Sequence, residues 1–271
     1  MGELDEEAFE EALAENPDEA LSMLAKMTGA TDEKLRALAQ RLAGRLVLDL
    51  ARSGPPRARG VGRLRTRSAA VAIGDIDVES SLDALIESRA SGEPPRLEDV
   101  MVREWSRPDT ALCLVIDKSG SMGGDRLAAA GLAAAAAAFR APIDHSVVAF
   151  AEQVIVIKAQ DTPRHAEEVV EDIFGLRGHG PTDLDFALAS ARAQLERSRA
   201  KRRLTILLSD CKTTVGADPL RSARMLDELV IIAPAEECEE AEEFAKETGA
   251  KLALLEGPSG VPAAFAKLLD I

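Results

Sequence analysis

The spacing of hydrophobic residues changes near residue 109. Before residue 51, apolar side chains recur every three or four positions, as Leu35, Leu38, Leu42 and Leu46 do. That spacing predicts amphipathic helices. After residue 109, short continuous apolar runs alternate with longer amphipathic stretches. Continuous runs of this kind are typical of strands that a parallel sheet buries on both faces.

The second half of the chain therefore predicts an α/β fold. Alternating strands and helices form right-handed crossovers, which give a doubly wound, mostly parallel sheet with helices on both faces. Residues 145–150 and 153–158 are too close for a crossover, so we expect an antiparallel hairpin at one edge. The expected strands are 111–117, 145–150, 153–158, 203–209, 229–233 and 251–255, and the expected helices are 125–140, 164–174, 182–198, 217–227, 236–248 and 260–269.

The pattern predicts three regions along the chain. Residues 1–51 form a small helical N-terminal region, residues 52–108 an Arg-rich linker and extended arm, and residues 109–271 the α/β domain. Within the middle region, residues 52–72 contain Pro55-Pro56 and six arginines and are expected to be extended. A short helix is expected from Ser81 and a strand or extended arm over 100–105.

Composition narrows the function classes. The formal charge of −14 argues against generic nucleic-acid binding, which needs a positive field. No apolar run is long enough to span a bilayer, and the acidic start lacks the features of a signal peptide. We therefore expect a cytoplasmic protein without a membrane partner. Three cysteines without a Cys-x-x-Cys spacing argue against a disulfide framework or a zinc ribbon.

A polar motif follows the first buried strand of the α/β domain. Asp117, Ser119 and Ser121 stand at alternate positions directly after six apolar residues. In open α/β sheets, ligands bind just past the carboxyl ends of the strands. Carboxylate and hydroxyl oxygens are hard donors, which suit Mg²⁺ or Mn²⁺. The motif therefore predicts a divalent-cation site.

This Asp-x-Ser-x-Ser motif resembles the metal-ion-dependent adhesion site of von Willebrand factor A (VWA) domains. Two further parts of that site follow in the family's order: Thr182 in a Gly-rich loop, and Asp210 at the end of the buried strand 203–209. The Asp…Leu…Gly…Arg run ahead of the first motif resembles bacterial, intracellular CoxE-like VWA proteins, which work with MoxR-type ATPases. The resemblance covers about residues 109–271.

The resemblance implies a role for each residue of the site. Ser119, Ser121 and Thr182 would coordinate the cation through their hydroxyls, and Asp117 and Asp210 would hold its bound waters. A free coordination position would then accept a carboxylate from another protein. The sequence departs from the family at Cys211, where the family usually has Gly after the last Asp, and places Lys118 and Lys212 beside the motifs.

Enzyme classes fit the sequence less well. Phosphatases with an aspartyl nucleophile need a second Asp two positions later, where this chain has Ser119. There is no Gly-x-x-x-x-Gly-Lys phosphate loop, and the three histidines show no metal-ligand spacing. We therefore expect a protein without enzymatic activity.

The resemblance thus implies a cytoplasmic, Mg²⁺-dependent adaptor that works with a MoxR-type AAA+ ATPase and binds an acidic residue of its partner. One alternative is a chelatase-type VWA subunit that assists metal or cofactor insertion. Another is a scaffold with a vestigial metal site. The arginines of residues 52–67 have no aromatic residues between them, so base stacking by this segment has no support.

Overall fold

The computed structural model describes residues 12–13, 15–28, 47, 63–69, 75–92, 94–106, 110–119, 124–141, 144–178 and 180–268. These residues form two compact units. The larger contains the described residues up to 47 together with 110–268, and the smaller contains residues 63–106. No helix among the described residues is long and apolar enough to cross a bilayer.

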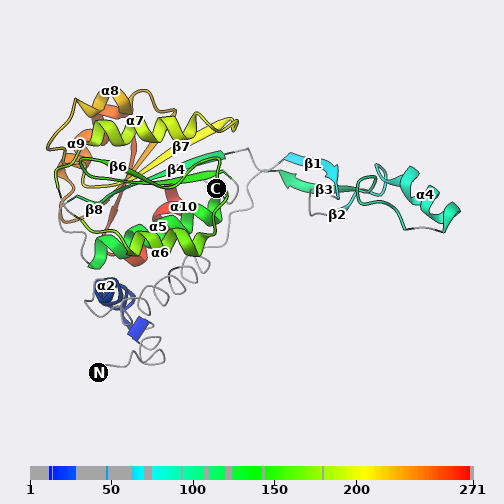
Figure 1. The fold of residues 1–271 in the computed structure, drawn as a ribbon, viewed down its shortest axis with the longest axis horizontal. Helices are drawn as coiled ribbons and strands as arrows, with labels where there is room; N and C mark the ends of the chain where they lie inside the picture. Colours follow the sequence, from blue (N-terminus) through cyan, green and yellow to red (C-terminus); the bar gives the residue numbers. More distant parts are fainter. Residues whose placement is uncertain are drawn as a thin grey trace. The chain divides into compact units, whose positions relative to one another are not determined.

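A six-stranded sheet forms the centre of the larger unit (Figure 1). Its strand order is β6-β5-β4-β7-β8-β9. Neighbouring strands are parallel throughout, except that β5 and β6 pair antiparallel at one edge. The predicted fold class and edge hairpin are therefore confirmed. The strands are β4 (Thr110–Asp117), β5 (His145–Phe150), β6 (Val154–Lys158), β7 (Arg202–Leu208), β8 (Glu228–Pro234) and β9 (Lys251–Leu255).

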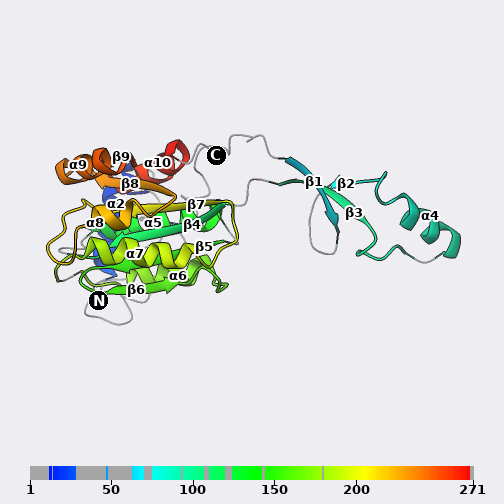
Figure 2. The same ribbon diagram turned by 90° about the horizontal axis from the view of Figure 1, so that it is seen from above.

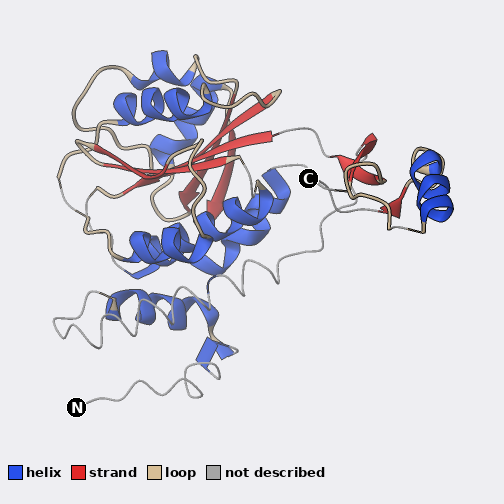
Figure 3. Cartoon of the chain, turned by 45° about the vertical axis from the view of Figure 1, so that its right-hand side comes forward, coloured by secondary structure: helices blue, strands red, loops and turns tan. Residues whose placement is uncertain are grey.

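Helices cover both faces of this sheet, as Figure 3 shows. In β4, Leu112, Leu114 and Ile116 pack into the core on one face, and Ala111, Cys113 and Val115 into the core on the other. Successive side chains of a strand point to opposite faces, so an unbroken apolar run supplies both cores. The first face is covered by α5 (Gly124–Arg140), α6 (Ala166–Phe174) and α10 (Val261–Leu268), the second by α7 (Leu184–Leu195), α8 (Pro219–Ala223) and α9 (Glu239–Thr248).

Helix α5 is covered on both sides. The helix α2 (Pro17–Met27) packs on the side of α5 away from the sheet, and its Leu21 and Leu24 join the same core (Figure 1). The alanines of α5 explain this arrangement, because small side chains let a helix approach both neighbours closely. Of the predicted helical region 1–51, α2 is the part that the structure describes as a whole helix; most of the remainder lies outside the described residues.

Polar contacts fix α2 at its N-terminal end. Asn16 caps the helix by accepting a hydrogen bond from the Glu19 amide at 3.4 Å. The Asp18 carboxylate accepts hydrogen bonds from the Ser259 amide at 2.7 Å and from its hydroxyl at 3.0 Å. Ser259 belongs to η1 (Pro258–Gly260), the 3₁₀ turn that leads into α10. Helix α2 therefore contacts both α5 and the start of the C-terminal helix.

The smaller unit is a three-stranded antiparallel sheet with one helix (Figure 2). Its strands β1 (Arg63–Ser68) and β2 (Asp75–Ile76) both pair with β3 (Met101–Ser106), and α4 spans Leu82–Ser91. The predictions of a helix after Ser81 and a strand at 100–105 are confirmed. The segment 52–72 was expected to be extended linker, but its part Arg63–Ser68 is a paired strand. A strand with a single apolar residue, Leu64, lacks the hydrophobic signal that would predict it.

Candidate metal centre

Asp117 ends β4 at the carboxyl edge of the sheet, as predicted. Its Oδ1 accepts a hydrogen bond from the Ser119 amide at 2.8 Å, and its Oδ2 accepts one from the Ser209 hydroxyl at 2.6 Å. Both oxygens are therefore held in place by hydrogen bonds. One of these bonds fixes the start of the loop after β4, and the other joins that loop to the end of β7.

Asp210 lies at the same edge because β7 is the parallel neighbour of β4, with Ile116 opposite Leu208. The Asp210 residue is 8% exposed. Its Oδ1 accepts a hydrogen bond from the Lys212 amide at 3.1 Å, and its Oδ2 lies 3.5 Å from Nη2 of Arg126. The register of two adjacent strands thus places two carboxylates from distant parts of the chain together.

The electrostatic surroundings of Asp117 suit a cation. Burial raises the pKa of its carboxyl above the ordinary value, although hydrogen bonds from Ser119 and Ser209 lower it. The negative charge of Asp210 raises this pKa further. A divalent cation between the two carboxylates would offset both the burial of charge and the repulsion.

Thr182 is held in the loop that precedes α7. It is 4% exposed, and its amide donates a hydrogen bond to the Thr214 hydroxyl at 2.8 Å. Its carbonyl accepts hydrogen bonds from the amides of Thr214 at 3.0 Å and Val215 at 3.2 Å. These bonds tie the Thr182 loop to the segment that follows Asp210.

Asp183, the next residue, fixes the start of α7. Its side chain caps the helix by accepting a hydrogen bond from the Phe186 amide at 2.9 Å, and its own amide donates to the Ala151 carbonyl at 2.9 Å. Asp185, in the first turn, accepts a hydrogen bond from the Ser222 hydroxyl at 2.5 Å. Both aspartates thus have structural partners.

The predicted site residues stand as follows. Asp117 is bonded to Ser119 directly and to the Asp210 segment through Ser209, and Thr182 is bonded to residues 214–215. Ser121 lies outside the described residues. Two participants were missed from the sequence, Ser209 and Arg126. The hydroxyl of Ser209 could have been suspected from its place beside Asp210, whereas nothing in the sequence indicates the contact of Arg126.

Cys211, where the sequence departs from the family, has a left-handed backbone with φ of 64°. It is the one non-glycine residue with positive φ among those that the structure describes. A glycine adopts this conformation without steric cost, which gives a physical reason for the family's usual Asp-Gly. Burial raises the pKa of the Cys211 thiol, and the charge of Asp210 raises it further. The thiol is therefore a poor nucleophile at neutral pH.

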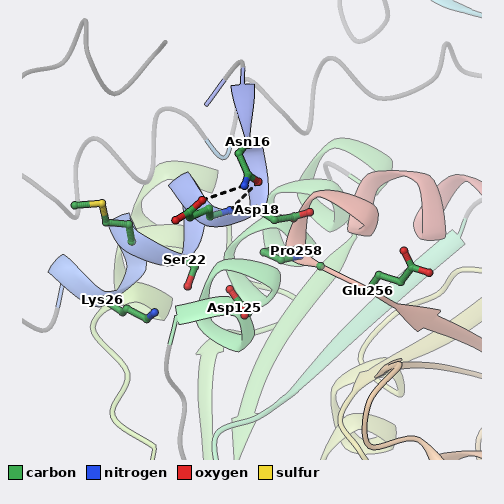
Figure 4. Close-up of a pocket in the computed structure, with 10 residues that line it drawn as sticks. Asn16, Asp18, Ser22, Lys26, Asp125, Glu256 and Pro258 are labelled. Atoms are coloured by element: carbon green, nitrogen blue, oxygen red, sulfur yellow. Dashed lines mark hydrogen bonds between the residues drawn. The ribbon is translucent and has the colours of Figure 1, made fainter. Parts of the chain in front are cut away.

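Two cavities adjoin this edge of the sheet. One, of about 400 Å³, is lined by Asp117, Asp210, Arg126 and Glu237 together with apolar residues such as Leu208 and Ala129. The other, of about 500 Å³, lies against α2 and is lined by Asp18, Ser22, Lys26, Asp125 and Glu256 (Figure 4). Asp125, Glu256, Gly257 and Pro258 line both cavities.

The donor set fits a hard divalent cation. Among the described residues no group of three or more His, Cys, Asp and Glu side chains could hold a metal. The predicted set is different, because it combines hydroxyls with two carboxylates, and hydroxyl, carboxylate and water oxygens suit Mg²⁺ and Mn²⁺. Ser119, Thr182, Asp117 and Asp210 are the described residues that could hold such a cation.

Comparison with protein families gives one match. The family model described as VWA domain containing CoxE-like protein matches residues 46–234. This range is more than half of the chain and includes the smaller unit and all elements from β4 to β8. No curated protein sequence matches the chain.

Several solved structures are similar in fold. Proximal thread matrix protein 1 from the mussel byssus is 16% identical, with a TM-score of 0.49 over 60% of this chain and 47% of that one. The manganese-loaded TRAP protein of Plasmodium vivax is 15% identical, with a TM-score of 0.48 over 60% of this chain and 74% of that one. The von Willebrand factor type A protein from Catenulispora acidiphila is 19% identical, with a TM-score of 0.46 over 62% and 43%. The chain spans about half the length of the mussel protein and less of the Catenulispora protein.

Proposed function

Because the chain belongs to the family of VWA-domain, CoxE-like proteins, we propose that it is a protein-binding adaptor that recognises its partner through a divalent cation. The observation that carries this proposal is the pairing of Asp117 and Asp210 at the carboxyl edge of the sheet. The Ser209 hydroxyl, 2.6 Å from Asp117, joins the two segments. Asp210 is 8% exposed and Asp117 is half-buried, and a bound cation would offset the repulsion between their charges.

The chain's own residues would hold the cation in two layers. The hydroxyls of Ser119, Ser121 and Thr182 would coordinate it, and Asp117 and Asp210 would hold its waters by hydrogen bonds. Mg²⁺ or Mn²⁺ is the proposed ion because every donor is oxygen. When bound, the ion supplies a coordination position for a carboxylate from a partner protein.

We further propose that the partner is a MoxR-type AAA+ ATPase, that the complex forms in the cytoplasm, and that the chain itself has no enzymatic activity. The CoxE-like character of the chain supports the choice of partner. Burial raises the thiol pKa values of Cys113, to about 12, and of Cys211, which argues against a cysteine nucleophile at these two positions.

A metal titration tests the site. Calorimetric titration of the full chain with Mg²⁺ should show one binding event that Asp117→Ala abolishes while the protein stays folded by circular dichroism. Asp161→Ala is the matched control, because Asp161 is an exposed carboxylate paired with Arg197 and takes no part in this site. Metal affinity retained in Asp117→Ala would contradict the assignment.

A binding experiment tests the partner. A purified MoxR-type ATPase should bind the immobilised chain in Mg²⁺ and be released by EDTA, and Asp117→Ala should not bind it. Binding that EDTA leaves unchanged would favour the second candidate, a scaffold whose metal site is vestigial. The Arg126 guanidinium, 3.5 Å from Asp210, is the observation that favours this candidate, because it already supplies a positive charge at the site.

A further inference from the structure

Arg126 lies in the first turn of α5, seven residues after Ser119. Its Nη2 is 3.1 Å from Oε2 of Glu237 and 3.5 Å from Oδ2 of Asp210. One guanidinium is thus shared between a carboxylate of the proposed metal site and a carboxylate outside it. The shorter contact is to Glu237.

Glu237 lies in the turn between β8 and α9. Besides Arg126, it accepts a hydrogen bond from Nζ of Lys212 at 3.1 Å. The hydrogen bond and the charge of Lys212, and after them the charge of Arg126, lower the pKa of Glu237 below its ordinary value. Glu237 is therefore an anion held between the side chains of Arg126 and Lys212.

The position of Arg126 affects any cation that binds beside Asp210. A guanidinium on Asp210 neutralises part of the charge that would attract the metal, and two positive charges at such short range repel each other. A guanidinium on Glu237 leaves Asp210 free to hold a metal-bound water. Arg126, Glu237, Asp117 and Asp210 line the same cavity of about 400 Å³, so the guanidinium and these carboxylates face one space.

We propose that Arg126 tunes the cation affinity of this site and that Glu237 acts by competing with Asp210 for the Arg126 guanidinium. The inference rests on the proposed function, because it requires a cation beside Asp210. Arg126 and Glu237 are positioning residues that are not metal ligands themselves. Anything that engages Glu237 would release Arg126 onto Asp210 and weaken metal binding.

Titration of the full chain with Mg²⁺ alone, and with Mn²⁺ followed by electron paramagnetic resonance, tests the proposal. Arg126→Gln should tighten binding, because Asp210 loses its competing cation. Glu237→Gln should weaken cation binding. Of the two carboxylates that Arg126 contacts, only that of Asp210 then remains. For partly exposed ion pairs we expect changes of about two- to fivefold in Kd.

The double variant separates this mechanism from a general effect of charge. If Glu237 acts through Arg126, Arg126→Gln/Glu237→Gln should bind as tightly as Arg126→Gln. If each charge acts on the cation independently, the two effects should cancel in the double variant, which would overturn the proposal. Glu240→Gln is the matched control, because Glu240 lies 4.0 Å from Lys212 in the same region, and it should have a smaller effect than Glu237→Gln.

The outcomes also distinguish this inference from the proposed function. Metal binding in the wild type that none of these variants changes would overturn the inference alone. Absence of binding in both the wild type and Arg126→Gln would overturn the proposed metal site and the inference with it. Thermal unfolding in EDTA checks that each variant is folded, which we expect because both side chains are more than one-third exposed.

Discussion

At the scale of single residues, the left-handed backbone of Cys211 stores strain next to the site. We predict that Cys211→Gly is more stable than Cys211→Ala by about 1 kcal/mol, because only glycine adopts this φ without a clash of Cβ. Both variants lose the buried sulfur, so their difference isolates the backbone term. Urea unfolding in EDTA measures it. Equal stabilities would mean that the surroundings of residue 211 relieve the strain.

The positions of individual site residues were predictable where they follow from a strand end. Asp117 could be placed because it directly follows an unbroken apolar run, and Asp210 because it follows Ile206, Leu207 and Leu208 after a single serine. The side chains that contact these carboxylates could not be predicted. The Ser209 bond depends on the register of β7 against β4, and the contact of Arg126 depends on the direction of a long side chain at the start of α5. Neither is encoded in local sequence spacing.

At the scale of elements, prediction succeeded where hydrophobic burial dominates. The ends of β5 and β9 agree with the expected ranges, β4 and β6 differ by one residue at one end, and β7 and β8 differ by one residue at both ends. Helix α8 is shorter than the expected 217–227. It ends at Ala223 because the following amides, those of Met225 and Leu226, bond three residues back instead of four. A helix in the region of α2 was predicted from the spacing of apolar residues. Its packing on α5 is a long-range contact, and such spacing does not predict the partner of a helix.

The contact between α2 and α5 gives the prediction at this scale. Gly124, at the start of α5, has φ of +39°, and a Cβ there would lie 2.4 Å from Oγ of Ser22. Gly124→Ala should therefore destabilise the protein by more than Gly249→Ala does. Gly249 also has positive φ, but a Cβ there meets nothing within 4 Å. The control, Gly249→Ala, should lower the free energy of unfolding by about 1 kcal/mol through backbone strain alone.

Chemical denaturation measures how much more stability is lost in Gly124→Ala than in Gly249→Ala. Repeating Gly124→Ala in a protein that also carries Ser22→Gly tests whether the contact with Ser22 causes the difference. In Ser22→Gly, which removes the nearest atom, the penalty for Gly124→Ala should approach that of the control. Gly124 begins α5 five residues after Ser119, so the same variants should change Mg²⁺ affinity if α2 helps to position the proposed metal site. If the two glycine substitutions cost the same, α2 does not approach α5 as closely as the structure shows.

At the scale of the whole molecule, the acidic character of the chain agrees with the role proposed for a cation. The formal charge is −14, and the cavity beside the site is lined by Asp117, Asp125, Asp210, Glu236, Glu237 and Glu256. Self-repulsion of this kind destabilises a compact state. A bound divalent ion would therefore relieve a local repulsion while it joins the ends of β4 and β7 to the loop before α7. The whole larger unit should respond to the metal.

That response is the last prediction. Ligand that binds only the folded state stabilises it by about 2.7 kcal/mol when its free concentration is 100 times Kd. Mg²⁺ should therefore raise the Tm of the wild type relative to EDTA, and Asp117→Asn should remove this increase. In EDTA, however, Asp117→Asn should unfold at a higher temperature than the wild type. The raised pKa of Asp117 shows that its charged form is penalised by burial and by Asp210 when no cation is present.

Differential scanning calorimetry of both proteins, with and without Mg²⁺, measures this reversal of order. Asp161→Asn, a change at an exposed carboxylate paired with Arg197, should preserve the metal effect. A lower Tm of Asp117→Asn in EDTA would contradict the prediction, because the hydrogen bonds from Ser119 and Ser209 would then outweigh the cost of burying the charge. If the reversal is observed, the free protein keeps Asp117 at a cost to its own stability. Such a cost is expected of a residue that is retained for binding, because the buried charge becomes favourable only when the cation is present.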